Sequence, residues 1–295
     1  MTTTPFGRMV TAMVTPMKPD GSIDYEGVAR LANHLVDNGH DGLVVNGTTG
    51  ESATTTDEEN VETVRAVVDA VGDRCAVTAG VGTNDTAHSV RAAKALAAVG
   101  ADAVLVVTPY YSKPTQAGIV EHFKAVVGAT DLPAMAYDIP SRTATPLASD
   151  TIRELAKIDQ MLAVKDAKGD FFEATKLMNE TDLLWYSGDD VSNLIWLSLG
   201  AVGLVSVVGH VAGNEFRAMI DAVDAGDMTR ARELHTRLIP AIDALMNTSQ
   251  GAIMAKAAMA DKGVIDSDFI RLPLLPATDD MRARLREGLS ESGLS

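Results

Sequence analysis

Residues 85–128 read DTAHSVRAAKALAAVGADAVLVVTPYYSKPTQAGIVEHFKAVVG, and this stretch decides the fold. Its first part has helical periodicity over Asp85–Val99 and ends at Gly100, as expected for a helix closed by a left-handed residue. A β-branched run follows over Ala103–Thr108, and a second helical segment spans Gln116–Gly128. A strand between two helices is typical of a parallel sheet, because parallel strands need crossover connections.

The same alternation continues toward both ends of the chain. Seven further apolar runs predict strands: Met9–Val14, Gly42–Asn46, Ala76–Ala79, Ala134–Tyr137, Leu162–Lys165, Leu184–Ser187 and Gly203–Val207. Eight strands at this spacing close most economically into an α/β fold, a (β/α)8 TIM barrel with its helices outside. The chain of 295 residues is long enough, since such a barrel takes roughly 250. A doubly wound open sheet is the alternative.

Helical segments fill the rest of the sequence. Between the strands they are expected over Tyr25–Asn38, Asp57–Val71 and Asp150–Ile158. From Asn214 onward there is no strand signal, and the pattern predicts four helices: Glu215–Ala225, Met228–Met246, Gly251–Lys262 and Asp279–Leu289. We therefore expect a catalytic barrel over residues 1–213 and a C-terminal helical extension over residues 214–295 that packs on it.

The composition excludes several classes of protein. With 46% hydrophobic residues the chain has enough apolar material for a large core, and a net charge of −15 disfavours nucleic acid or an anionic membrane as a partner. The single cysteine, Cys75, cannot form an internal disulfide. No signal peptide or membrane span is recognisable, so a cytoplasmic protein is expected.

Polar residues follow the apolar runs at the strand ends where a barrel of this kind carries its active site. Five such segments are Asn46–Glu51, Thr108–Tyr111, Tyr137–Arg142, Lys165–Asp166 and Ser187–Asp190. One tyrosine at a strand end is more often a packing residue with a solvated hydroxyl group than a catalytic residue. The convergence of several hydroxyl groups on one face favours a site.

Lys165 is the most informative of these positions, because it directly follows the apolar run Met161–Val164. Burial disfavours the ammonium form, and a neutral amine can attack a carbonyl to form a Schiff base. The alternative is a structural lysine paired with Asp166 or Asp189.

Two glycine-rich segments bear on ligand binding. Gly47–Gly50 leaves a strand and precedes a helix, so its amides and hydroxyls suit a carboxylate, whereas a P-loop would need a following Gly-Lys-Ser/Thr. Gly80–Asn84 resembles part of a dinucleotide fingerprint without its third glycine, which leaves a nicotinamide-dependent oxidoreductase as a rival function.

The six histidines lack ligand spacing, so no metal is expected. A non-catalytic binding protein with the same barrel fold is the third possibility.

Together these segments resemble the dihydrodipicolinate synthase family of pyruvate-dependent Schiff-base lyases. The resemblance covers nearly the whole chain and rests on Gly47–Ser52, Val107–Tyr111, Tyr137–Thr143, Val164–Gly169 and Ser187–Asp190. It implies a lyase of lysine and diaminopimelate biosynthesis that condenses pyruvate with L-aspartate 4-semialdehyde, with neither a metal nor an organic cofactor.

The resemblance also implies a role for each residue. Lys165 would form the imine with pyruvate, Tyr137 would transfer protons there, and Thr48 and Tyr111 would complete a proton relay. Tyr111 is typically supplied across a dimer interface, and the family is usually a homotetramer built as a dimer of dimers.

The resemblance likewise places substrate-binding groups. Thr49 would hold the pyruvate carboxylate, with Gly188 and the backbone carbonyl of Val205 at the same pocket, and Arg142 would receive the semialdehyde carboxylate. Related N-acetylneuraminate lyases and 2-keto-3-deoxy sugar-acid aldolases share the lysine and the tyrosine. They ordinarily lack the Ser-Arg-Thr pattern of Ser141–Thr143, so the synthase is favoured.

The resemblance finally implies a possible allosteric site for L-lysine. Its residues would be Ser52, Ala53, Asn84, His88 and Tyr110. A histidine and a glutamate of lysine-inhibited members align here with Asn60 and His88, so the glutamate that pairs with the ligand's ammonium is missing. We expect weak or absent inhibition by lysine.

Overall fold

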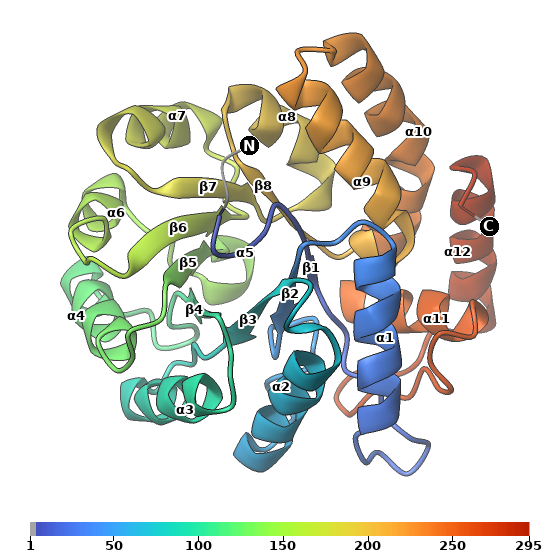
Figure 1. Cartoon of the computed structure of the whole chain (residues 1–295), viewed down its shortest axis with the longest axis horizontal. Coiled ribbons are helices and arrows are strands. Elements are labelled where there is room, and N and C mark those ends of the chain that lie inside the picture. Colours follow the sequence, from blue (N-terminus) through green and yellow to red (C-terminus); the bar gives the residue numbers. More distant parts are fainter. Residues whose placement is uncertain (1–3, 295) are drawn as a thin grey trace.

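The computed structural model describes residues 4–294 and contains a closed barrel of eight parallel strands in chain order (Figure 1). The strands are β1 (Met9–Ala12), β2 (Gly42–Val45), β3 (Ala76–Gly80), β4 (Ala103–Val107), β5 (Ala134–Asp138), β6 (Met161–Asp166), β7 (Leu184–Ser187) and β8 (Gly203–Ser206). Because β1 pairs with β8, the sheet has no open edge. The predicted TIM barrel is therefore confirmed, and the open sheet is wrong.

Helices surround the barrel on the outside (Figure 1). Those between strands are α1 (Tyr25–Asp37), α2 (Asp57–Val71), α3 (Thr86–Ala98), α4 (Gln116–Val127), α5 (Pro140–Thr143), α6 (Ser149–Leu155), α7 (Phe171–Glu180) and α8 (Asn193–Leu199), the last preceded by the short 3₁₀ helix η1 (Asp190–Ser192). The five helices expected between strands are present to within three residues at each end. Helices α5, α7 and α8 were not predicted.

The alternation of side chains along each strand separates two apolar clusters. On β6, Ala163 packs in the small cluster inside the barrel, whereas Val164 packs in the large cluster between the sheet and the helices. Successive side chains point to opposite faces of a strand, so Lys165 points into the barrel as Ala163 does. On β5, Tyr137 also belongs to the inner cluster.

The C-terminal part of the chain is helical, as predicted. It contains α9 (Gly209–Asp224), α10 (Met228–Met246), α11 (Gly251–Asp261) and α12 (Asp279–Glu291), which lie together beside α1 and the β8 side of the barrel (Figure 1). Helix α9 begins at Gly209 rather than at Glu215 and therefore runs through the predicted boundary at residues 213/214, with a non-helical residue at Ala212. The division into two domains stays a prediction.

None of the helices within residues 4–294 is both long enough and apolar enough to cross a membrane.

Candidate active site

Lys165 and Tyr137 lie opposite each other on neighbouring strands, since Tyr137 of β5 is in register with Lys165 of β6. The Lys165 Nζ atom is 4.0 Å from the centroid of the Tyr137 ring, and Lys165 is only 4% exposed. Burial lowers the pKa of the Lys165 ammonium to about 7, while the Asp190 carboxylate raises it and the Arg142 guanidinium lowers it. Near neutral pH a large share of this lysine is therefore a free amine.

The predicted alternative, an ion pair of Lys165 with Asp166 or Asp189, does not form. None of the ion pairs in the described part of the chain includes Lys165. The Asp166 carboxylate points outward, where it accepts hydrogen bonds from the amides of Lys168 at 2.8 Å and Gly169 at 3.0 Å. Lys165 is thus buried without a salt-bridge partner, which is unusual for a lysine.

Asp190 is a buried carboxylate whose role the sequence did not reveal. It accepts hydrogen bonds from the Ser206 hydroxyl at 2.5 Å and from the amides of Val207 and Val208 at 2.8 and 2.9 Å. The Asn193 side-chain amide donates a further bond at 2.9 Å. Asp190 therefore fixes the end of β8 to the loop after β7. The pair Asp189–Asp190 in the sequence was the only signal for it.

Gly188 lies against the Lys165 side chain. Its amide donates to the Asp166 carbonyl at 2.7 Å, and a Cβ atom at this position would come within 2.9 Å of that oxygen and 3.0 Å of Lys165 Cγ. Glycine is therefore required here so that the β7 loop can approach the Lys165 stem closely.

The turn after β2 presents backbone amides and hydroxyls, as predicted for an anion site. The amides of Gly50 and Glu51 close the turn on the carbonyls of Gly47 and Thr48. The amides of Thr48 and Thr49, by contrast, donate to no acceptor within residues 4–294. Thr49 is buried and Thr48 is exposed at the mouth of the barrel.

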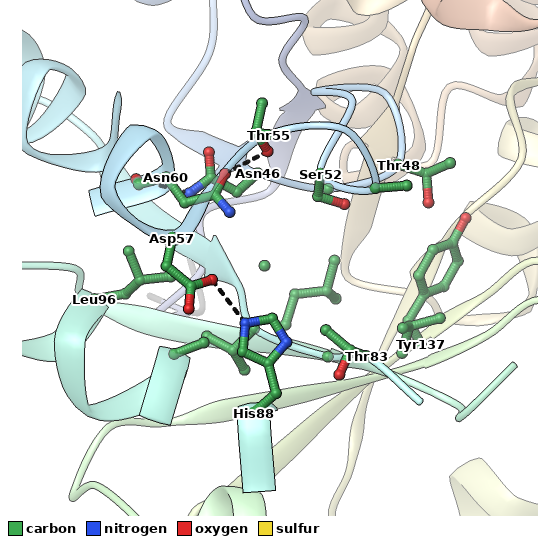
Figure 2. A pocket seen from close by; sticks show the side chains of 18 of the residues that line it. Asn46, Thr48, Ser52, Thr55, Asp57, Asn60, Thr83, His88, Leu96 and Tyr137 are labelled. Carbon is green, nitrogen blue, oxygen red and sulfur yellow. Dashed lines mark hydrogen bonds and ion pairs between the residues drawn. The ribbon is translucent and has the colours of Figure 1, made fainter. Parts of the chain in front are cut away.

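A cavity of about 400 Å³ opens at the C-terminal ends of β2–β5. Thr48, Tyr137 and Arg142 all line it, and Figure 2 shows the Tyr137 hydroxyl and Thr48 on the same side of the cavity. Lys165 does not line the cavity itself, but its amine lies against the ring of Tyr137, which does. Four other predicted residues also lie outside its lining: Thr49, Tyr111, Gly188 and Val205. Val205 is buried in the inner cluster that contains Tyr137.

Tyr111 points away from this site, although its neighbour Tyr110 lines the cavity. The Tyr111 side chain is 88% exposed, and its backbone has a φ of +70°. A left-handed conformation is strained for a large residue that is not glycine and is a frequent mark of functional segments. One chain alone therefore does not bring Tyr111 to Tyr137.

A sequence profile of the Dihydrodipicolinate synthetase family matches residues 5–292. The chain belongs to this family. It is 51% identical over 291 residues to 4-hydroxy-tetrahydrodipicolinate synthase from Kineococcus radiotolerans, which covers 99% of this chain and 94% of that protein. The predicted family is confirmed, and with it the predicted lyase function.

Solved structures of dihydrodipicolinate synthases share the fold over their whole length. The enzyme from Cyanidioschyzon merolae with lysine bound is 40% identical, with a TM-score of 0.96 over 99% of this chain and 100% of that one. The Acinetobacter baumannii enzyme complexed with pyruvate is 34% identical, with a TM-score of 0.94 over 99% and 100%.

The residues that the family resemblance assigned to a lysine site lie mostly in the same cavity. Ser52, Ala53, His88 and Tyr110 line it, but Asn84 does not. The His88 Nε2 atom lies 2.7 Å from Asp57 Oδ1, and a dashed line in Figure 2 marks this contact. His88, which the resemblance aligns with the family's glutamate, thus already has an acidic partner.

The glycines of Gly80–Asn84 have a packing role in this member of the family. A Cβ atom on Gly80 would come within 2.3 Å of the Asn46 carbonyl oxygen, and one on Gly82 within 2.4 Å of the Val107 amide nitrogen. They allow neighbouring backbones to approach, which explains the glycines without a dinucleotide. Within residues 4–294 there is no cluster of three or more histidine, cysteine, aspartate or glutamate side chains that could hold a metal.

Proposed function

We propose that the chain condenses pyruvate with L-aspartate 4-semialdehyde through a Schiff base on Lys165, giving 4-hydroxy-tetrahydrodipicolinate. The observation that carries this proposal is a buried lysine that forms no ion pair with any carboxylate of residues 4–294, has a pKa of about 7 and has a tyrosine ring beside its amine. The names of the relatives at about half identity support the same reaction.

The reaction balances with the loss of one water. The Lys165 amine attacks C2 of pyruvate, and the resulting carbinolamine loses water to form an imine. A proton leaves C3, and the enamine carbon attacks the aldehyde carbon of the second substrate to form the new C–C bond. The amino group of that substrate then attacks C2 and displaces Lys165, which closes the ring and frees the enzyme. The lysine is the electron sink, so the steps call for no metal or organic cofactor.

Tyr137 is the proton-transfer group of this proposal. Burial raises the pKa of its hydroxyl well above the usual value, so the phenol stays protonated at neutral pH and can donate to the departing hydroxyl of the carbinolamine. Thr48, on the same side of the cavity, would pass protons between Tyr137 and the cavity.

The pyruvate carboxylate would bind at the turn after β2. The unused amides of Thr48 and Thr49 and the Thr49 hydroxyl are hydrogen-bond donors for an anion. Gly188 and the Val205 carbonyl would complete the pocket on the Lys165 side.

Arg142 would receive the carboxylate of the semialdehyde. It lies in α5 at the edge of the cavity, and a planar guanidinium binds a carboxylate through two parallel hydrogen bonds. This charge favours an amino-acid-derived acceptor over the polyhydroxylated acceptor of a sugar-acid aldolase.

The active assembly would be a homotetramer, a dimer of dimers in which Tyr111 of one protomer completes the proton relay of its partner. The exposed phenol and the strained backbone of Tyr111 support this arrangement. The working compartment would be the cytoplasm, in keeping with a single buried cysteine.

Inhibition by L-lysine would be weak or absent. The enzyme from Cyanidioschyzon merolae binds lysine, but here His88 is paired with Asp57 where a carboxylate for the ligand's ammonium would be needed. Steady-state rates measured with increasing L-lysine test this, and strong inhibition at low lysine would contradict it.

Trapping with borohydride tests the central step. After incubation with pyruvate and borohydride, intact mass and peptide mapping should show one reduced pyruvyl adduct, located on Lys165. The adduct should be absent from Lys165→Ala and present in Lys94→Ala, which removes an exposed lysine. An adduct on another lysine, or none in a folded sample, would overturn the proposed mechanism.

A further inference from the structure

A second buried lysine, Lys256, is distant in sequence from the Gly47–Gly50 turn but lies close to it in space. Lys256 of α11 forms an ion pair with Glu51, the residue that directly follows the Gly47–Gly50 turn. The two side chains are 0% and 2% exposed. The proposed reaction uses neither of them.

The pair belongs to a continuous set of contacts from the C-terminal region. Lys256 Nζ also donates to the Phe269 carbonyl at 2.7 Å, and the Arg271 amide donates to the second Glu51 oxygen at 2.9 Å. One oxygen of the Glu51 carboxylate is thus held by Lys256 of α11, and the other by the Arg271 amide in the segment between α11 and α12.

Arg271 extends this hold along the loop. Its guanidinium donates to the Thr54 carbonyl at 2.7 Å and binds Glu59 through both carboxylate oxygens, at 2.5 and 2.7 Å. Glu59 is also the capping-box residue of α2, where it accepts from the Thr56 amide at 2.9 Å. The segment that joins the Gly47–Gly50 turn to α2 is therefore held by hydrogen bonds at both of its ends.

The backbone of Glu51 indicates that its side chain is needed at this position. Its φ is +62°, a conformation that glycine adopts without strain and glutamate does not. A glycine would relieve the backbone but would leave Lys256 buried without a carboxylate. The strained backbone and the buried ion pair therefore occur at the same residue.

We propose that the Glu51–Lys256 ion pair, together with Arg271, is a positioning clamp by which the C-terminal region sets the Thr48 and Thr49 donors at the spacing that a 2-oxo acid carboxylate requires. The clamp rests on the proposed function of that turn. Misplacing donors by a fraction of an ångström weakens binding and catalysis even when the donors themselves are present. These are positioning residues, since they touch the turn and not the substrate.

The test compares variants of the clamp with a matched core variant of the same region. Lys256→Met and Glu51→Gln should raise the pyruvate concentration needed for half-maximal borohydride trapping by about tenfold, and hydrogen exchange of residues 47–54 should become faster. Leu285→Ala, in the buried face of α12, should lower the melting temperature without either effect. If the buried variants fail to fold, Arg271→Met, at a partly exposed position, can be measured in their place and should show the same two effects.

The double variant Glu51→Gln/Lys256→Met separates positioning from stability. It leaves no unpaired buried charge, so its melting temperature should recover toward the wild-type value, while half-maximal trapping stays shifted. The clamp proposal would be wrong if half-maximal trapping returned to the wild-type pyruvate concentration together with stability. It would also be wrong if every clamp variant had the wild-type value. A wild-type chain that forms no adduct would instead overturn the proposed function, and the exchange experiment would still report on the loop.

Discussion

Two buried lysines with opposite surroundings occur in this chain, at the end of β6 and in the middle of α11. Burial lowers the pKa of both ammonium groups, but Lys256 has the Glu51 carboxylate against it, whereas Lys165 has a tyrosine ring. A carboxylate partner favours the charged form of a buried lysine, whereas a buried lysine without one loses its proton more readily and can then act as a nucleophile. The partner, and not the burial, decides the chemistry.

The largest contrast is expected in stability. Lys256→Met leaves Glu51 buried without its ion-pair partner and should lower the free energy of unfolding by about 3–5 kcal/mol. Lys165→Met removes an amine that has no carboxylate partner, so it should change stability by about 1 kcal/mol or less, or raise it. Urea unfolding of the two variants at neutral pH measures both values. Equal losses would mean that Lys165 has a charged partner after all.

The sequence predicted one of these lysines and missed the other for a physical reason. Lys165 ends a short apolar run in a repeating pattern, so strand alternation alone directs it into the barrel. The partner of Lys256 is 205 residues away, and no local pattern encodes such a contact. The signal that was available is the composition of α11, whose residues from Ala252 to Met259 are apolar apart from the lysine and are all buried.

The fold followed from the sequence because every strand and most helices carry local periodicity. The short helix α5 was missed, since four residues after a proline give no helical pattern. The start of α9 was misplaced because Gly209 and Gly213 are poor helix formers, and the tight packing of Gly213 against His40 needs the whole fold to be seen. The exposure of Tyr111 likewise depends on tertiary structure.

A second, smaller effect should separate Tyr137 from another buried tyrosine. Tyr137→Phe removes the proposed proton-transfer group and should lower kcat by about 10²-fold with little loss of stability. Tyr186 is also buried inside the barrel, but its hydroxyl donates to the Gly7 carbonyl at 2.8 Å, away from the cavity. Tyr186→Phe should therefore lower the melting temperature more than kcat. Equal losses of kcat in Tyr137→Phe and Tyr186→Phe would contradict a proton-transfer role for Tyr137.

The smallest expected effect is a pH dependence of stability that belongs to Lys165 alone. Its pKa is about 7 in the folded chain and about 10.4 when unfolded, so between these values the unfolded chain binds more protons. Stability therefore rises with pH across this window, and the cost of keeping the amine neutral is largest at its acid end. Lys165→Met has no such group. From about pH 7 to about pH 9, wild type should gain roughly 2 kcal/mol in unfolding free energy relative to that variant.

Denaturant unfolding of wild type, Lys165→Met and Lys94→Met across this range measures the difference directly. Lys94 is exposed, so removing it should leave a curve parallel to that of wild type. A constant gap between wild type and Lys165→Met would mean that the folded chain keeps Lys165 protonated, and the contrast with Lys256 would then lose its basis. An unfolding free energy of wild type that rises with pH relative to that of Lys165→Met would show that the barrel itself, before any substrate binds, maintains the free amine that imine formation needs.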